Sequence, residues 1–203
     1  MPDHQDNLQS LPDGLPVPTD DGACDHLVGC DLPDIDLIGA DGPVNLQRAT
    51  GPTIIYCYPM IGRPEVALPD NWDETPGARG CTVQSLAYDQ RVEEIEALGA
   101  KVFGLSTQTA EEQAEAASRL GLRQQLLSDH DRRIITALNL PTFETSGKVY
   151  VRRLTLGIIE ARVERVWYPV FPPGQDASEV VRWLANLSQA VSPPSASGEG
   201  DKI

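Results

Sequence analysis

The sequence predicts an α/β fold in which helices flank a mixed central β-sheet. Short apolar runs without polar alternation, such as residues 53–58, are typical of strands that are buried on both faces. Between such runs lie segments with apolar residues at helical spacing, such as residues 82–98. Strands that are joined through helices run parallel, so the first strands of the sheet are expected to be parallel.

The expected elements alternate in the order β-α-β-α-β-α-β-β-α. The expected strands are residues 53–58, 101–106, 125–128, 150–159 and 162–168, and the expected helices are residues 82–98, 109–121, 131–138 and 176–187. The last two strands form a hairpin with its turn at Glu160 and Ala161, which adds an antiparallel pair to the sheet. This order is compatible with a thioredoxin-like sheet.

Local signals support the ends of these helices. The first helix stops at Gly99, a residue type that favours the left-handed conformation at a helix C-terminus. A capping box of Thr109 with Glu112 begins the second helix, which ends near Gly121. The third helix stops before Pro141, and the fourth is amphipathic throughout.

Both chain ends differ in composition from the segment between them. Residues 1–26 are rich in Asp, Gln, Pro and Gly without hydrophobic periodicity, so we expect a flexible arm. Residues 191–203 are expected to form a disordered tail, and residues 27–190 one domain. No apolar run approaches the ~18 residues of a membrane span and no secretory signal is present. The expected location is therefore the cytoplasm.

The charge balance excludes several classes of function. The 203 residues include 30 acidic and 16 basic side chains, which gives a net charge of -14 and argues against binding to nucleic acid or anionic membranes. No glycine-rich nucleotide-binding motif is present, and the 3 histidines are too scattered for a metal site. We therefore expect neither a metal nor another cofactor.

Cys81 is the strongest candidate for a reactive residue. It follows Gly80 at the end of a long Pro/Gly-rich loop, residues 59–80, and opens an amphipathic helix. The free N–H groups and the dipole of a helix N-terminus favour a thiolate over a thiol, and Arg79 adds positive charge. The thiolate is the nucleophilic form of cysteine. The alternative is that Cys81 is a small buried hydrophobe, as free cysteines usually are.

The residues around Cys81 resemble the active-site region of peroxiredoxins. Pro59 follows the end of a strand, and residues 76–85 read Pro-Gly-Ala-Arg-Gly-Cys-Thr-Val-Gln-Ser. The Gly-Cys-Thr-Val-Gln stretch is similar to the bacterioferritin-comigratory-protein (Q-type) branch, and the long preceding loop is similar to a bacterial peroxiredoxin-like subgroup. Farther along, Arg153 begins a segment that resembles the Arg-x-Thr strand of the family. The resemblance covers residues 27–190.

The resemblance implies a thioredoxin-like fold and a thiol peroxidase. The Cys81 thiolate would attack the O–O bond of a hydroperoxide and become a sulfenic acid. Backbone N–H groups around Gly80 and Cys81, together with the Arg153 guanidinium, would stabilise the developing charge. Neighbouring strand residues point to opposite faces, so Arg152 would point away from the site. Pro59, Gly80 and Thr82 are expected to line the substrate pocket, and Arg79 is counted with the catalytic residues.

Two positions depart from the pattern of the family. The threonine expected three residues before the cysteine is Ala78 here, and Thr75 and Thr82 are candidates to supply the missing hydroxyl. The resolving cysteine of the Q-type branch is expected five residues after Cys81, where this chain has Leu86. The disulfide of that branch therefore cannot form in this chain.

The remaining cysteines leave the mechanism of resolution open. Cys24 and Cys30 lie in or beside the expected arm and can resolve the sulfenic acid, pair with each other, or do neither. Cys57 lies in a central strand and is expected to be buried. A one-cysteine mechanism with an external thiol reductant is the alternative; thioredoxin, glutaredoxin and low-molecular-weight thiols are the candidates in the family.

Other functions and assemblies stay open at this point. One alternative is a redox-sensing or binding module with little turnover, which Ala78 and Leu86 keep open. Another is a thiol–disulfide oxidoreductase that uses Cys24 and Cys30, although the chain has no Cys-x-x-Cys motif. The apolar residues 168–173 are a candidate subunit contact for a homodimer. The acidic composition also predicts that the reactive cysteine lies in a small basic pocket.

Overall fold

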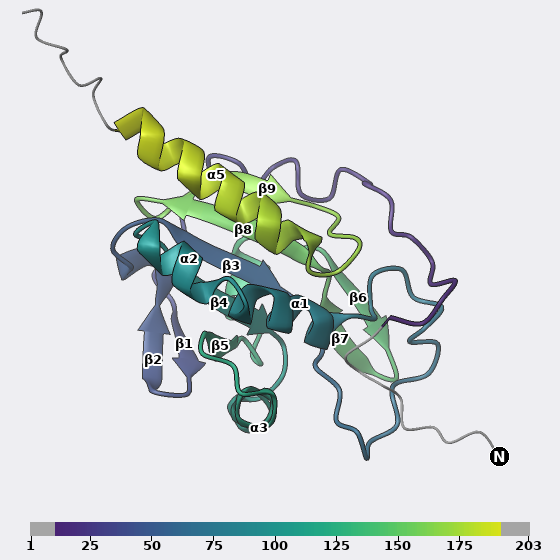
Figure 1. Cartoon of the computed structure of the whole chain (residues 1–203). Helices are drawn as coiled ribbons and strands as arrows, with labels where there is room; N and C mark the ends of the chain where they lie inside the picture. Colours follow the sequence, from purple (N-terminus) through teal and green to yellow (C-terminus); the bar gives the residue numbers. More distant parts are fainter. Residues whose placement is uncertain (1–10, 192–203) are drawn as a thin grey trace, which may run out of the picture.

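The computed structural model describes residues 11–191 (Figure 1). Residues 1–10 of the expected arm and residues 192–203 of the expected tail lie outside this part. The strands are β1 (Asp36–Gly39), β2 (Gly42–Asn45), β3 (Thr53–Cys57), β4 (Lys101–Ser106), β5 (Gln125–Ser128), β6 (Thr142–Thr145), β7 (Lys148–Val151), β8 (Leu154–Ile159) and β9 (Arg162–Trp167). The helices are α1 (Cys81–Asp89), α2 (Val92–Ala97), α3 (Ala110–Leu120), α4 (Arg133–Ala137) and α5 (Gln175–Val191), with a short 3-10 helix at Leu46–Arg48.

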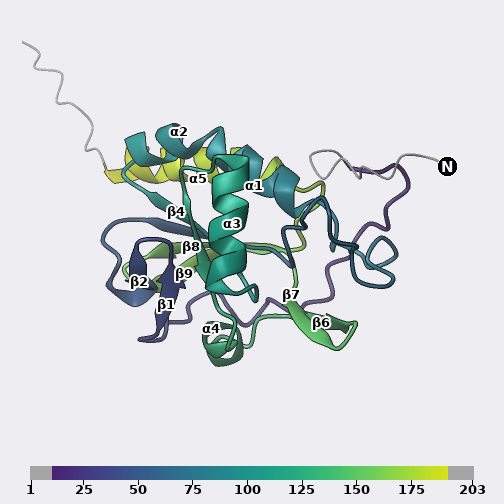
Figure 2. The same cartoon turned by 90° about the horizontal axis from the view of Figure 1, so that it is seen from below.

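A seven-stranded mixed sheet in the order β2-β1-β5-β4-β3-β8-β9 forms the centre of the molecule. Strands β3, β4 and β5 pair in parallel, and β8 pairs antiparallel with both β3 and β9. The predicted α/β fold with a mixed central sheet is therefore confirmed. Strands β6 and β7 form a separate two-stranded sheet that lies to one side of the central sheet (Figures 1 and 2).

The central sheet separates two hydrophobic cores. Alternate residues of β3 point to opposite faces, so Ile54 and Tyr56 join one core while Ile55 and Cys57 join the other. The first core also contains Cys81 and residues of α1, α2, α3 and α5. The second contains residues of α4 and of the N-terminal segment. Figure 2 shows α1, α2 and α5 on one side of the sheet and α4 on the other.

The clearest local prediction is confirmed at α3. The Thr109 hydroxyl accepts a hydrogen bond from the Glu112 amide at 3.2 Å, and the Glu112 carboxylate accepts one from the Thr109 amide at 2.9 Å. The helix ends at Gly121, whose φ of 65° is left-handed. The capping box and the terminal glycine thus define both ends of α3, as their spacing predicts.

Two predicted elements have wrong boundaries. The predicted helix over residues 82–98 is two helices, α1 and α2, which are interrupted at Gln90 and Arg91. The predicted strand over residues 150–159 is also two elements: β7 pairs with β6, and β8 pairs with β3. In both cases buried apolar residues lie on either side of a short polar break, so periodicity alone does not reveal it. Strands β1, β2 and β6 are missed altogether because their side chains are largely exposed.

The described part of the expected arm, residues 11–26, contains neither helix nor strand. Its C-terminal part nevertheless packs on the domain, because Cys24 is only 5% exposed and belongs to the second core. The Tyr168 hydroxyl donates a hydrogen bond to Asp21 at 2.9 Å. Residues at the end of the expected arm therefore contact the domain, and the boundary at residue 27 stays a prediction. Within residues 11–191 no helix has the length and apolar character to cross a membrane.

Candidate active site

Cys81 is the first residue of α1, directly after the N-terminal cap residue Gly80. Gly80 adopts φ 99°, a conformation that glycine reaches without strain, and this lets the long loop turn sharply into the helix. The Cys81 side chain is 3% exposed and packs in the first core, where Tyr58 and Ile61 also lie. The sulfur atom is therefore at the base of the helix and largely shielded from bulk water.

Two N–H groups point at the Cys81 sulfur. An Arg153 Nη2 atom lies 3.2 Å from Sγ, and the Met60 amide nitrogen lies 3.4 Å from it. In the thiol form the S–H group can donate to the Ala78 carbonyl at 3.5 Å. A cationic and a neutral donor aimed at one sulfur favour negative charge on that atom. The geometry is suited to a thiolate nucleophile.

Arg153 connects β7 with β8 and is 3% exposed. Its Nη2 atom also donates to three carbonyls of the loop that leads into α1, at Gly77 (3.2 Å), Ala78 (3.3 Å) and Arg79 (2.9 Å). Its Nη1 atom donates to Gln84 Oε1 at 2.5 Å. A buried cation is costly unless it has hydrogen-bond partners and a compensating charge. Arg153 thus fixes the shape of the loop and supplies positive charge at Cys81.

The Arg79 side chain lies differently from what the sequence suggests. Its guanidinium forms an ion pair with Asp73, with N–O distances of 2.5 and 3.1 Å. The Arg79 carbonyl, by contrast, accepts a hydrogen bond from Arg153. Part of the positive charge predicted at Arg79 is therefore neutralised by Asp73, and a catalytic role for this residue stays a prediction.

A substrate pocket lined by Pro59, Gly80 and Thr82 stays a prediction. Pro59 is buried two residues after the end of β3, Gly80 directly precedes Cys81, and Thr82 is 2% exposed. Thr75, one candidate for the missing hydroxyl, donates instead to the Asn71 carbonyl at 2.8 Å within its own loop. Ala78 is fully buried against Trp72 and its neighbours.

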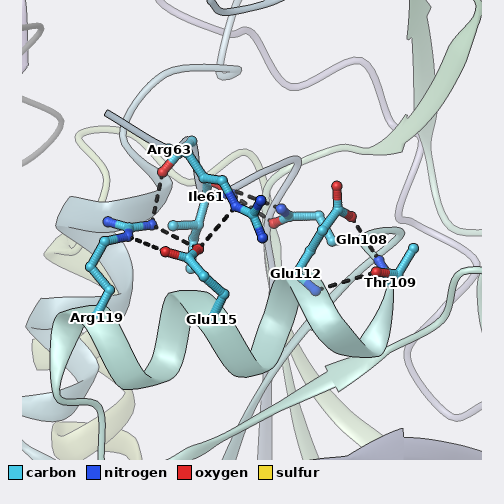
Figure 3. A network of polar contacts seen from close by, with 8 residues as sticks. Ile61, Arg63, Gln108, Thr109, Glu112, Glu115 and Arg119 are labelled. Atoms are coloured by element: carbon cyan, nitrogen blue, oxygen red, sulfur yellow. Dashed lines mark hydrogen bonds and ion pairs between the residues drawn. The ribbon is translucent and has the colours of Figure 1, made fainter. Parts of the chain in front are cut away.

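The Met60 amide is a donor that sequence reasoning missed, because it predicts amides around Gly80 and Cys81 instead. Ile61, the next residue, exchanges two hydrogen bonds with the Gln108 side chain, at 2.8 and 3.2 Å (Figure 3). Arg119 of α3 donates to the Gly62 carbonyl at 3.0 Å. These contacts hold the start of the long loop against α3 and thereby place the Met60 amide.

The same loop is tied to α3 by charge (Figure 3). Glu115 pairs with Arg63 at 3.2 Å and with Arg119 at 2.7 Å. No local signal reveals these contacts, since Arg63 and Glu115 are 52 residues apart in the sequence.

The predicted likeness to a known family is confirmed by comparison with known proteins. The model of the AhpC/TSA family matches residues 73–158, a segment that contains both Cys81 and Arg153. Over this segment the chain is similar to peroxiredoxins. It is 27% identical over 146 residues to the chloroplastic peroxiredoxin Q of Sedum lineare, a match that spans 71% of this chain and 70% of that protein.

Solved structures share the fold of this chain. Peroxiredoxin Q of Xanthomonas campestris superposes with a TM-score of 0.61 at 24% identity, covering 78% of this chain and 96% of that chain. Peroxidoxin BcpB of Mycobacterium tuberculosis superposes with a TM-score of 0.64 at 22% identity, covering 83% and 100% respectively. The predicted thioredoxin-like fold is thereby confirmed.

The other cysteines lie outside the hydrophobic core that contains Cys81. Cys24 and Cys57 belong to the second core, on the opposite face of the central sheet. Burial raises the pKa of the Cys24 thiol from its ordinary 9.0 to about 12, and nearby Asp21 adds to this effect. Cys30 is half-buried and its thiol donates to the His26 carbonyl at 3.1 Å. All four cysteines are free thiols.

Two hollows adjoin the site at Met60. Their volumes are about 330 and 270 Å³. Both are lined by Met60, Gln108, Glu112, Lys148 and Tyr150. The larger one adds His130 and Arg132, and the smaller one adds the apolar Val66 and Leu68. Both hollows thus combine basic side chains with the acidic Glu112, and the basic pocket predicted around Cys81 stays a prediction.

Proposed function

We propose that this thiol-dependent peroxidase reduces hydrogen peroxide or organic hydroperoxides through Cys81. The observation that carries the proposal is the convergence of two N–H donors on one buried sulfur, from Arg153 at 3.2 Å and from Met60 at 3.4 Å. A nucleophilic thiolate and donors aimed at the reacting atoms are the two requirements of this chemistry.

The proposed reaction is a two-electron displacement at oxygen. The Cys81 thiolate attacks the terminal oxygen of the hydroperoxide, so that an S–O bond forms while the O–O bond breaks. The sulfur is oxidised to a sulfenic acid, and the leaving oxygen takes a proton and departs as water or an alcohol. Arg153 Nη2 lies close enough to donate to the oxygen on which negative charge develops.

Organic hydroperoxides are included for two reasons. The solved structure of a Xanthomonas campestris bacterioferritin comigratory protein, 23% identical to this chain, is described in terms of alkyl peroxide reduction. In this chain the smaller hollow beside Met60 is lined by apolar side chains, among them Val66, Leu68 and Tyr150. That surface provides room for an apolar substituent next to the residue that donates to the Cys81 sulfur.

For the second half of the cycle we propose an external thiol reductant. Leu86 occupies the position of the resolving cysteine in the Q-type branch, and Cys24 lies on the other face of the sheet. The external thiol would attack the sulfenic acid, release water and form a mixed disulfide, which a second thiol would reduce. Thioredoxin, glutaredoxin and low-molecular-weight thiols are the candidates; a cytoplasmic location and a homodimer remain part of the proposal.

The test begins with the reduced protein and one equivalent of hydrogen peroxide. Dimedone labelling followed by mass spectrometry should locate the sulfenic acid at Cys81, and Cys81→Ser should abolish peroxide consumption. Cys30→Ser, which removes a half-buried thiol away from the Cys81 core, is the matched control and should consume peroxide normally. If Cys81 stays reduced while another thiol is oxidised, the proposal is wrong.

A redox sensor of the same fold would behave differently in this test. It would show the Cys81 sulfenic acid but no sustained peroxide consumption with any of the three reductants. The replacement of the threonine of the family by Ala78 is the observation that favours this alternative.

A further inference from the structure

A buried carboxylate lies behind Arg153, on the side away from the Cys81 sulfur. Asp176 is in the first turn of α5 and is 3% exposed. Its Oδ2 atom accepts three hydrogen bonds: from Gln84 Nε2 at 3.0 Å, from the Tyr88 hydroxyl at 2.8 Å and from the Thr155 hydroxyl at 2.7 Å. Its Oδ1 atom is buried and has no hydrogen-bond partner among residues 11–191. All three of these hydrogen bonds of the Asp176 carboxylate are thus accepted by Oδ2.

Gln84 links this carboxylate to the active site. Its Nε2 atom donates to Asp176, and its Oε1 atom accepts from Arg153 Nη1 at 2.5 Å. The two ends of a glutamine amide have almost the same shape, so its hydrogen-bond partners decide which way it faces. Asp176 Oδ2 acts as an acceptor for Gln84, so it requires the NH₂ end of the amide. The carbonyl end must then face Arg153.

The Gln84 bridge between Arg153 and Asp176 also allows the charge of Arg153 to be compensated. Arg153 and Asp176 are both 3% exposed, and Gln84 separates them. A direct ion pair between them would draw the guanidinium toward α5. With Gln84 in between, the carboxylate compensates the buried cation while the Nη2 atom remains at Cys81, 3.2 Å away.

We propose that Asp176 is a positioning residue that holds Arg153 at Cys81 through Gln84. The peroxide readout of this proposal rests on the proposed function, whereas the orientation of Arg153 does not. The contacts converge from three elements: Gln84 and Tyr88 belong to α1, Thr155 belongs to β8, and Asp176 belongs to α5.

The first experiment removes the acceptor. Asp176→Leu leaves the Gln84 amide without its partner, so the guanidinium loses its fixed orientation. The second-order rate constant for oxidation of Cys81 by hydrogen peroxide should fall about tenfold, the effect expected when a hydrogen bond to a charged group is lost. Asp176→Asn keeps an oxygen where Oδ2 lies, so its rate constant should fall less. If Asp176→Leu does not fold, Asp176→Ser replaces it, because its hydroxyl is too short to reach Gln84.

A double-mutant cycle separates positioning from a purely structural role. Gln84→Met removes the bridging amide. If Asp176 acts only through Gln84, Asp176→Leu should have no further effect on the rate in the Gln84→Met background. The matched control is Asp129→Ser, which removes another buried carboxylate, 2% exposed, that accepts the Arg133 and Ile135 amides at the start of α4. It should lower the melting temperature without changing the rate constant.

The same variants are then alkylated with iodoacetamide, and the Cys81 peptide is followed by mass spectrometry. Alkylation should slow in Asp176→Leu and in Gln84→Met. The double variant should react no more slowly than Gln84→Met alone. If the wild-type protein does not react with peroxide but alkylation shows this pattern, the proposed function fails and the positioning role stands. A folded Asp176→Leu variant with wild-type rates, or rate losses that add in the double variant, would overturn the positioning role.

Discussion

Arg153 Nη2 lies 3.2 Å from the Cys81 sulfur although the two residues are 72 positions apart in the sequence. The contact joins the first residue of α1 to the connection between β7 and β8. It depends on the strand break that puts Arg153 directly before β8 and on Gly80, the residue that caps the start of α1. The fold thus brings together a nucleophile and a cation that belong to separate elements.

Replacement of this cation tests its part in the reaction. Arg153→Lys keeps the charge but loses the planar fork that serves Gln84 and Cys81 together. The rate of Cys81 oxidation by peroxide, measured by stopped-flow fluorescence, should fall by about 10²-fold, as when a preorganised donor is removed from an active site.

The neighbouring residue provides a matched control. Arg152 is less buried and donates to the Thr142 carbonyl at 3.3 Å, so Arg152→Lys should leave the rate unchanged. Equal effects of the two substitutions would show that Arg153 acts only through the general charge of the protein.

The buried position of Cys24 predicts a one-cysteine mechanism. With its pKa raised to about 12, Cys24 is a neutral thiol near neutral pH and therefore a poor nucleophile. Cys24→Ser and Cys30→Ser should each retain turnover with an external thiol. Mass spectrometry of the oxidised wild-type protein under non-reducing conditions is the decisive measurement, and a peptide that links Cys81 to either cysteine would disprove the prediction.

The turn before Cys81 predicts a strong effect of a single methyl group. Gly80 has φ 99°, and a Cβ atom there would lie 2.3 Å from Pro173 Cγ and 2.9 Å from Leu11 Cδ2. Gly80→Ala should lower the free energy of unfolding by about 2–4 kcal/mol, from backbone strain and overpacking together. It should also slow peroxide reduction, because the start of α1 must shift.

Gly77→Ala is the control for the backbone term alone. Gly77 also has a positive φ, 78°, but a Cβ atom would meet Pro18 only at 3.7 Å, an ordinary contact. Gly77→Ala should lower the free energy of unfolding, read from urea unfolding curves, by about 1 kcal/mol. Equal losses for the two variants would argue against the clash with Pro173.

Local chemistry explains which parts of the fold are predictable from the sequence. The sequence predicts strands β4 and β5 with their correct ends because each contains its own apolar run. It predicts helix α3 with its correct ends because the Thr109 capping box belongs to that segment. The break between β7 and β8 is not found, because apolar residues resume after Arg152 and Arg153, and Val151 and Leu154 on either side are both buried.

The candidate site divides in a similar way. The residue pattern around Cys81 and the Arg-x-Thr segment at Arg153 are visible in the sequence, and the structure brings these two residues together. The Met60 amide leaves no side-chain signal, since any residue carries it. Asp176 reaches Gln84 across 92 positions, so only the folded chain shows that they meet.

Buried thiols predict a loss of stability at alkaline pH. In the unfolded chain Cys24 ionises near its ordinary pKa of 9.0, whereas in the folded protein burial raises this pKa to about 12. Burial also raises the pKa of Cys57. Between pH 9 and 12 the folded state therefore holds more protons than the unfolded state, so the free energy of unfolding decreases as the pH rises. Below pH 9 both states are protonated and this contribution is constant.

Denaturant unfolding at a series of pH values, under reducing conditions, measures this dependence. Cys24→Ala should be less stable than the wild-type protein at neutral pH because it leaves a small cavity in the second core. Its stability should nevertheless decrease less steeply above pH 9, because one of the titrating thiols is gone. Identical slopes for Cys24→Ala and the wild-type protein would mean that Cys24 does not contribute to the alkaline transition.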